Sequence, residues 1–302
     1  MAADLDMLNA TALRYFHAVS DAGSIAAAAE RLNVAGSAVS RQIRMLETAI
    51  MTELFERQPR GMKLTNAGEQ FASYVRRLVL EQKEIIANIA SNQSELSGTI
   101  NIVTAEGFAT SFVPKIAAGF QARHPAIAIR SVTGSHNDIF REIRQGHSDL
   151  GLSFENKPSA DISTLVRFEC DTKIIMRKGH DLSRKESLTL ADVAAYPIAT
   201  SLGTTTRQLF EHRAAIEGVE FAIKFESNNS TSIFNYISGS DAIAFGVELT
   251  AREWIMRGDL VARPLKHSDA FKRKIYVSVM AGRVLPRRLE MFIDFIRDEL
   301  EK

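Results

Sequence analysis

Residues 24–57 read SIAAAAERLNVAGSAVSRQIRMLETAIMTELFER, and two short helical patterns lie a tight turn apart within this stretch. The first, at residues 24–32, is nearly all alanine on one face, so the backbone of another helix can pack against it at close range. The second begins at Gly36 and places Val39, Ile43 and Leu46 at helical spacing. Two short helices joined by such a turn predict a helix-turn-helix.

The opposite face of the second helix is polar and basic. It carries Ser37, Ser40, Arg41 and Arg44. Arginine can bond the edge of guanine bidentately, and serine can donate to bases or phosphates. An apolar back and a basic front, at the length of a recognition helix, suit docking in a major groove. We therefore expect these four residues to contact double-stranded DNA.

The residues that follow predict a wing. Residues 54–57 and 62–64 have the pattern of two short strands, and the Pro/Gly turn 58–61 lies between them. Arg60 at its tip is placed to enter a minor groove or hold a phosphate. Residues 1–65 carry seven basic and seven acidic side chains. The unit is therefore not basic overall, but Arg57, Arg60 and Lys63 are expected on the same side as Arg41 and Arg44, opposite most of the acids.

The amino-terminal third resembles the DNA-binding domain of LysR-type transcriptional regulators. The matching residues are Leu13-Arg14-Tyr15-Phe16, Gly23-Ser24, Ala28-Ala29-Glu30-Arg31-Leu32, Ser37 to Ile43, Leu46-Glu47, Leu54 to Arg57 and Leu64 to Glu69. The chain also matches that family in length and order of parts. The resemblance implies α/β architecture overall, with a winged helix-turn-helix, a long linker helix and a two-lobed effector domain like the periplasmic solute-binding proteins.

Two residues depart from the family pattern. Gly36 stands where the family commonly has a base-contacting Gln, so the operator sequence does not carry over. Met51 stands where the family favours a glycine that ends the recognition helix in a left-handed conformation. The helix must therefore end differently, or Met51 must adopt a strained conformation.

A long helix is predicted over residues 66–93, with Thr65 as its N-cap. Its apolar positions follow a heptad spacing through Phe71, Val75, Leu78, Gln82, Ile85 and Ile89. A second copy of the chain is the simplest partner for such a stripe, and the family resemblance extends this dimer to a tetramer. The alternative is an ordinary helix that packs on its own domain. The expected divisions are 1–65 (DNA binding), 66–96 (linker and dimerisation) and 97–302 (effector binding).

Beyond residue 97, strand and helix patterns alternate, which predicts a parallel sheet covered on both faces. By the resemblance, the chain crosses to a second lobe near residue 168 and returns near residue 270. Lobe 1 is then about 97–168 and 271–302, and lobe 2 about 169–270. Pro286 is expected to open a final amphipathic helix that carries Leu289, Phe292, Phe295 and Ile296.

Four polar loops follow predicted strands, at residues 104–107, 133–136, 200–204 and 227–231. Open α/β sheets bind ligands beyond the carboxyl ends of their strands. By the resemblance, the residues that hold a small-molecule effector are Ala105, Glu106, Ser135, His136, Ser201, Asn229 and Ser230. The alternative is that these residues are ordinary helix caps. Glu106 favours an amine or polyhydroxy ligand or else points to solvent, and His136 bonds a ligand carboxylate or caps its helix. The family often has Leu-Pro before the glutamate where this chain has Gly246-Val247-Glu248, and the loss of this Pro-fixed loop weakens the transfer of any relative's ligand to this chain.

Several classes of protein are disfavoured. The single cysteine, Cys170, allows no disulfide within one chain and fits a reducing cytoplasm. We take it as structural, with a redox sensor as the alternative. No apolar run is long enough to span a membrane, and the amino terminus lacks a signal-peptide pattern. No P-loop, GxSxG, HExxH or Cys/His metal spacing is present in the sequence.

We therefore expect no catalytic residue, metal or cofactor. The predicted protein is a cytoplasmic, effector-controlled DNA-binding regulator. Its expected partners are double-stranded DNA, a small molecule, further copies of itself and RNA polymerase, with no membrane. The alternatives are a solute-binding protein without DNA function and an enzyme with a DNA-binding appendage. The sequence does not identify the effector, the operator, the target genes or the sign of regulation.

Overall fold

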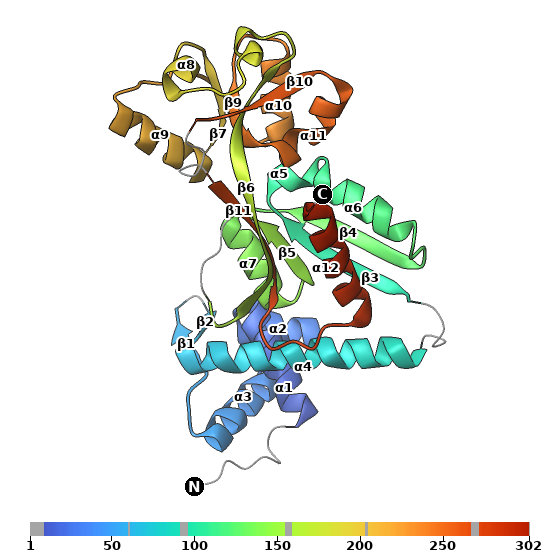
Figure 1. Cartoon of the computed structure of the whole chain (residues 1–302). Helices are drawn as coiled ribbons and strands as arrows, with labels where there is room; N and C mark the ends of the chain where they lie inside the picture. Colours follow the sequence, from blue (N-terminus) through green and yellow to red (C-terminus); the bar gives the residue numbers. More distant parts are fainter. Residues whose placement is uncertain are drawn as a thin grey trace. The chain divides into compact units, whose positions relative to one another are not determined.

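The computed structural model describes residues 9–59, 61–90, 96–154, 159–202, 205–266 and 272–301. The chain forms two compact units (Figure 1). The amino-terminal unit comprises residues 1–93 with the short segments 144–147 and 282–284, and the carboxyl-terminal unit comprises the remainder.

The amino-terminal unit is a cluster of helices with a small two-stranded sheet. Its elements are α1 (Ala10–Ala22), α2 (Ile25–Leu32), α3 (Gly36–Ile50), β1 (Phe55–Gln58), β2 (Gly61–Leu64) and α4 (Asn66–Ala90). Asn9 and Ser24 cap α1 and α2 through their side chains, and α1 ends at Gly23 in the left-handed conformation. The predicted helix-turn-helix is α2 and α3, whose apolar faces close the core with Phe16 and Val19 of α1.

Met51 ends α3 in the left-handed conformation, with φ 53° and ψ 34°. The strained-residue alternative is therefore the one this chain adopts, although a methionine there lacks the freedom of glycine. The next residue still closes the helix end, because the Thr52 N–H donates to the Glu47 carbonyl at 3.1 Å. The Glu47 carboxylate also accepts the N–H groups of Leu54 and Phe55, at 2.9 and 3.1 Å. The recognition helix thus anchors the start of the wing directly.

The wing is the antiparallel pair β1 and β2, in register from Phe55 opposite Leu64 to Gln58 opposite Gly61. It is attached to the turn between α1 and α2, since the Met62 N–H donates to the Gly23 carbonyl at 2.7 Å. Gly61 is required at this approach: a Cβ there would lie 2.3 Å from the Gly23 oxygen, and its φ is 141°. Arg60 lies outside the described residues.

The two halves of the predicted heptad stripe on the long helix α4 have different surroundings. Thr65 caps it, accepting the Gly68 N–H at 2.9 Å. Near this end Val75 is buried and Phe71 packs on the core of the same unit. Further along, Ile85 and Ile89 are 58% and 80% exposed. The first turns of α4 therefore pack within their own unit, as the alternative prediction has it. The second half of the stripe remains exposed in a single chain.

The carboxyl-terminal unit has two lobes built on seven paired strands and a separate strand pair. Its strands are β3 (Gly98–Thr104), β4 (Ile127–Thr133), β5 (Leu150–Ser153), β6 (Ile162–Arg177), β7 (Ile198–Ser201), β8 (Ile223–Ser227), β9 (Ala244–Val247), β10 (Leu260–Pro264) and β11 (Lys272–Met280). The strand order is β10-β6-β11-β5-β3-β4, with β9 also paired to β6, and β7 pairs with β8.

The expectation of a parallel sheet is only partly right. It holds for β3 with β4 and β5, and for β7 with β8. It is wrong for β6 and β11, which pair antiparallel to each other and to their further neighbours. The physical reason is that one strand carries the chain into lobe 2 and the other carries it back, so they run in opposite directions. Strand β6 changes partner between Asp171, paired with β11, and Thr172, paired with β9.

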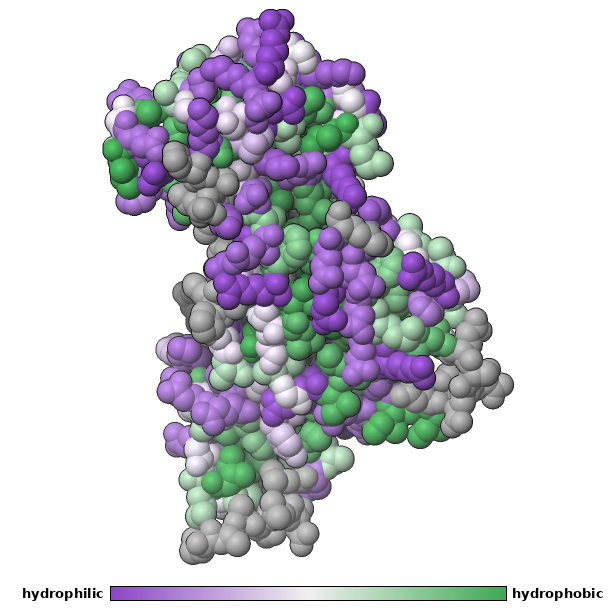
Figure 2. Space-filling view, viewed as in Figure 1, coloured by the Kyte–Doolittle hydropathy of each residue, from purple (hydrophilic) through white to green (hydrophobic). Residues whose placement is uncertain are grey.

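Helices cover these strands. They are α5 (Glu106–Ala109), α6 (Phe112–Gln121), α7 (His136–Gln145), the 3-10 helix η2 (Asp181–Arg184), α8 (Leu190–Ala194), α9 (Thr205–Glu217), α10 (Ser230–Ser238), α11 (Glu248–Arg257) and α12 (Arg287–Leu300). In α12 all four predicted core residues are buried, in a core shared with α6 and the lobe 1 strands. Neither α11 nor β10 has a long apolar repeat, so the sequence alone does not predict these two elements. The face of lobe 2 that is seen in Figure 2 is mainly hydrophilic, with scattered apolar side chains.

Gly68 offers a test of the packing of α4. A Cβ at Gly68 would lie 2.0 Å from the Leu54 carbonyl oxygen, whereas a Cβ at the helical Gly36 meets only a methyl carbon of Ile25 at 3.8 Å. We expect Gly68→Ala to lower the free energy of unfolding by about 1–3 kcal/mol, as overpacking does. Gly36→Ala should be neutral or stabilise by up to about 1 kcal/mol through helix propensity. Denaturant melts of both variants measure this, and equal effects would contradict the packing described here.

Candidate functional site

The recognition face of α3 is built by the burial of its opposite face. Val39, Ile43 and Leu46 are at most 2% exposed, which turns Ser37, Arg41 and Arg44 toward solvent. Ser40 is half-buried between the two faces. The side chains of Arg41 and Arg44 make no hydrogen bond or ion pair with any other described residue. Two cations on one helix face are thus left available for phosphates or base edges.

The wing adds two further cations. Glu56 and Lys63 are opposite each other in the register, as are Arg57 and Met62. Arg57 and Lys63 are exposed, and within the described part of the chain neither forms an ion pair. The sequence-predicted cations that are described therefore all lie on the surface.

A cavity of about 510 Å³ lies in the carboxyl-terminal unit, where strands β3, β4, β7 and β8 end. All four predicted loops line it. The predicted residues among its lining are Ala105, Glu106, Ser135, His136, Ser201 and Ser230. Residues from both lobes contribute, which is the arrangement expected beyond the carboxyl ends of strands.

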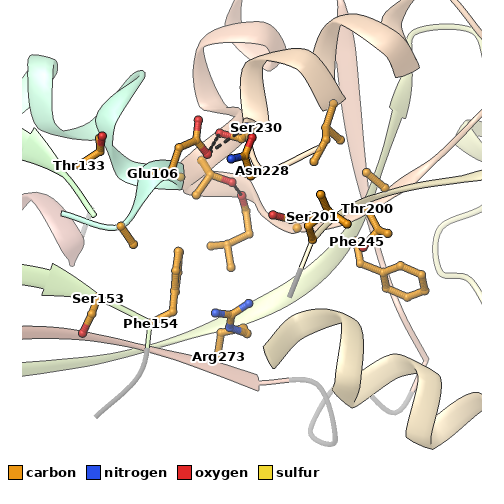
Figure 3. Close-up of a pocket in the computed structure, with 18 of the residues that line it drawn as sticks. Glu106, Thr133, Ser153, Phe154, Thr200, Ser201, Asn228, Ser230, Phe245 and Arg273 are labelled. Carbon is orange, nitrogen blue, oxygen red and sulfur yellow. Dashed lines mark hydrogen bonds between the residues drawn. The ribbon is translucent and has the colours of Figure 1, made fainter. Parts of the chain in front are cut away.

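Asn229 is placed differently from the other predicted residues. Its carboxamide oxygen accepts the Ser232 N–H at 2.8 Å and so caps α10. The neighbouring Asn228 lines the cavity instead (Figure 3). Asn229 is therefore a helix cap, which is the alternative to a role in ligand binding.

Ser135 both lines the cavity and caps a helix. It lines the cavity, and its hydroxyl donates to Asp138 at 2.6 Å while the Ser135 N–H donates to the same oxygen at 3.0 Å. These two hydrogen bonds hold the pKa of Asp138 below its usual value. In return the Ser135 oxygen accepts the Asp138 N–H at 3.3 Å. Ser135 is thus a cap at the start of α7 as well as a wall of the cavity. The neighbouring His136 packs its ring on Phe140, with the ring centres 4.6 Å apart.

Phe154 and Arg273 form part of one wall of the cavity, and Phe108 packs behind Phe154. Phe154 stacks on Phe108 with ring centres 4.2 Å apart, and the Arg273 guanidinium carbon lies 4.4 Å from the centre of the Phe154 ring. Neither of the two lining residues, Phe154 and Arg273, was predicted from the sequence. Phe154 could have been found, because it directly follows β5 and so obeys the same strand-end rule. Arg273 could not, since it lies inside strand β11 and not in a loop that follows a strand.

Direct hydrogen bonds join the lobes at the edge of the cavity. One oxygen of the Glu106 carboxylate, Oε2, accepts both the N–H and the hydroxyl of Ser230, at 2.9 and 2.7 Å (Figure 3). Beside this pair, the Thr110 and Thr231 hydroxyls are 3.5 Å apart, and the Ser111 hydroxyl donates to the Leu249 carbonyl at 3.4 Å. Glu106, at the first residue of α5, therefore neither points to solvent nor stands alone.

Cys170 lies on β6 where the chain passes between the lobes. Burial raises the pKa of its thiol to about 11, so the thiol is protonated at neutral pH. Because the thiolate is the reactive form, this environment favours a structural role. Among the described residues, no cluster of His, Cys, Asp and Glu is arranged to hold a metal ion. The described helices also include none with the length and apolarity that crossing a bilayer requires.

Comparison with known proteins covers both units. Residues 10–69 match the bacterial regulatory helix-turn-helix domain of the lysR family, and residues 93–301 match the LysR substrate binding domain. The chain is 26% identical to the SDS degradation transcriptional activation protein of a Pseudomonas species, over 95% of each chain.

Two solved structures share the fold. Full-length OxyR of Pseudomonas aeruginosa has a TM-score of 0.67 at 20% identity, over 95% of this chain and 94% of that one. Full-length CbnR in complex with its target DNA has a TM-score of 0.56 at 20% identity, over 96% and 99%.

The cavity gives a direct test through Ser201, at the end of β7. A ligand in the cavity that is present at a hundredfold excess over its Kd should stabilise the folded chain by about 2.7 kcal/mol. A leucine at position 201 fills the space and removes a donor, so Ser201→Leu should abolish the thermal shift of any cavity ligand found by screening. Ser238→Leu, at an exposed serine that is not part of the cavity lining, is the control and should retain the shift. A full shift in Ser201→Leu would place the ligand elsewhere.

Proposed function

The chain belongs to the LysR family of bacterial transcriptional regulators, and from this membership we propose how its parts divide the work. The family combines sequence-specific DNA binding with a domain that takes a small-molecule effector. We assign DNA binding to residues 1–65, chain pairing to 66–96 and effector binding to 97–302. The observation that carries this assignment is an exposed basic helix face and a two-lobed cavity in one chain.

DNA contact falls to the predicted cations and serines of the amino-terminal unit. Arg41 and Arg44 on α3 suit the major groove, since exposed arginines there can bond base edges or phosphates. Ser37 and Ser40 add shorter contacts, and Arg57 and Lys63 hold backbone phosphate from the wing. We keep Arg60 in this set on the sequence argument alone.

Effector control works through the cavity. A ligand that touches both lobes favours the arrangement in which its contacts are complete. By linkage, it then favours whichever DNA-bound form goes with that arrangement. We propose that Ala105, Glu106, Ser135, His136, Ser201 and Ser230 contribute to the effector site, and that Asn229 supports it by capping α10. Phe154 and Arg273 join this set from the structure.

Pairing of two chains falls to the uncovered half of α4. Ile85, Ile86 and Ile89 are each more than half exposed, although the side chains are large and apolar. A second copy of the chain covers them, and further contacts between such dimers give a tetramer. We also propose contact with RNA polymerase and a cytoplasmic location, because transcription is the process controlled.

The two alternatives are weaker. A solute-binding protein without DNA function does not account for the helix-turn-helix match at residues 10–69. An enzyme with a DNA-binding appendage gains no support from the sequence, which contains no P-loop, GxSxG, HExxH or Cys/His metal spacing. We therefore propose that the chain turns over no metabolite.

Arg41 tests the DNA assignment. Arg41→Ala should weaken binding to the native promoter by about 1–3 kcal/mol if the contact is to a base edge. A phosphate contact would instead weaken all sequences equally and reduce the salt dependence. Fluorescence anisotropy measures both, with Arg213→Ala on α9 of the other unit as the control. Wild-type affinity and salt slope in Arg41→Ala would remove Arg41 from the interface.

Ile85 tests the pairing. Ile85→Asp would bury a charge against the partner chain, which is strongly unfavourable. Light scattering should then report a particle of half the wild-type mass or less, relative to a chain of 33.4 kDa. Gln70→Asp adds the same charge at an exposed position of α4 outside the stripe and should leave the mass unchanged. An unchanged mass for Ile85→Asp would exclude pairing through this half of the helix.

A further inference from the structure

The carboxylate of Glu106, which belongs to α5 in lobe 1, contacts the amino-terminal end of α10 in lobe 2. Helix α10 runs Ser230–Ser238, and Glu106 Oε2 accepts the first N–H of that helix together with the Ser230 hydroxyl. The amino-terminal end of a helix carries partial positive charge and is where an anionic group of a ligand would otherwise be attracted. Here a side chain from lobe 1 already supplies the anion.

The second carboxylate oxygen remains available. Both hydrogen bonds of Glu106 end on Oε2, and Oε1 accepts none from the described residues. Glu106 is half-buried and lines the cavity. An ionised carboxylate offers about four lone-pair sites over its two oxygens. One oxygen of a carboxylate that lines the cavity is therefore without a donor among the described residues, and Ser230 and Asn228 lie beside this side chain (Figure 3).

We propose that Glu106 sets the charge class of the effector. The cavity takes a ligand that presents a hydrogen-bond donor, an ammonium or hydroxyl group, at the α10 end, and it excludes a carboxylate or phosphate there. This inference rests on the proposed function, that the cavity holds the effector. A donor group completes the hydrogen bonding of Oε1, whereas a second anion within a few ångströms of Glu106 is repelled.

The other charged side chain of the cavity does not oppose this assignment. Arg273 lies beside Phe154, apart from the Glu106 and Ser230 pair (Figure 3). Any attraction that it exerts on an acceptor acts on a different part of the ligand. The two charges therefore orient a ligand that has a donor group at one end, and Glu106 decides which end faces α10.

A matched set of probes tests the charge class. Butylammonium, butyramide and butyrate have the same alkyl chain and differ in the charge of the head group. The full-length protein is titrated with each, and binding is followed by thermal shift and calorimetry. Wild type should prefer butylammonium to butyrate. In Glu106→Gln the amide oxygen can still accept the Ser230 hydrogen bonds but carries no charge.

Affinity for butylammonium should therefore fall about 10- to 100-fold in Glu106→Gln, as expected for a lost hydrogen bond to a charged group. Affinity for butyramide should change little, and affinity for butyrate should rise. Glu290→Gln is the control, since Glu290 is an exposed glutamate in the first turn of α12 and does not line the cavity.

Two kinds of failure are distinguishable. If butylammonium binds Ser201→Leu as well as wild type, it binds outside the cavity, and both the cavity assignment and the charge class are overturned. If binding is lost in Ser201→Leu but Glu106→Gln keeps the wild-type order of the three probes, only the role of Glu106 is overturned. Absence of any preference among the probes in wild type overturns it too.

Discussion

The pairing of β6 with β11 is the constraint on which the carboxyl-terminal unit depends. Strand β6 is paired with β11 up to Asp171 and with β9 and β10 beyond it. One continuous strand thus belongs to the sheets of both lobes, and β11 returns beside it in the opposite direction. Backbone hydrogen bonds hold β6 and β11 in this register, and these two strands connect the lobes. The ends of β3 and β4 in lobe 1 and of β7 and β8 in lobe 2 therefore border one cavity. Cys170 and Arg273 face each other in this register, which brings a cavity cation onto the crossing itself.

A different constraint organises the amino-terminal unit. The apolar face of α3 is buried, and the same helix anchors the wing through Glu47 and the backbone N–H groups of Leu54 and Phe55. The direction of the basic face and the position of the wing are therefore coupled through one helix. Met51 keeps the chain reversal that a glycine usually provides, at the cost of a strained backbone. The left-handed end of the helix is thus present in this chain with a methionine in place of a glycine.

The polar side chains at the cavity can cap helices and can also bind a ligand. The free N–H groups at the start of a helix need hydrogen-bond acceptors, and a ligand bound at the same place needs hydrogen-bond partners too. One serine or asparagine side chain there can therefore either cap the helix or bind the ligand. In this chain Asn229 and Ser135 satisfy helix N–H groups of α10 and α7, and Glu106 satisfies the first N–H of α10 from the opposite lobe. Under the role that we propose for Glu106, this contact between the lobes also couples the arrangement of the lobes to the charge of the bound effector.

The sequence by itself determined the local elements and the order of parts. Ser24, Gly23 and Thr65 act at helix ends as their residue types predict, and the apolar spacing of α3 and α12 identifies their buried faces. The loops of the cavity followed from the rule that ligands lie beyond strand ends. These features depend on residues close together in the chain, where spacing and cap chemistry suffice.

Tertiary structure decided the rest. The antiparallel direction of β6 and β11, the stack of Arg273 on Phe154 and the contact of Glu106 with Ser230 all join residues more than a hundred positions apart. No local pattern encodes such contacts. The split role of α4 has the same origin: its heptad spacing is uniform, but only the first half finds a core in its own unit. Periodicity shows which side chains share a face, and what covers that face depends on the packing of the whole chain.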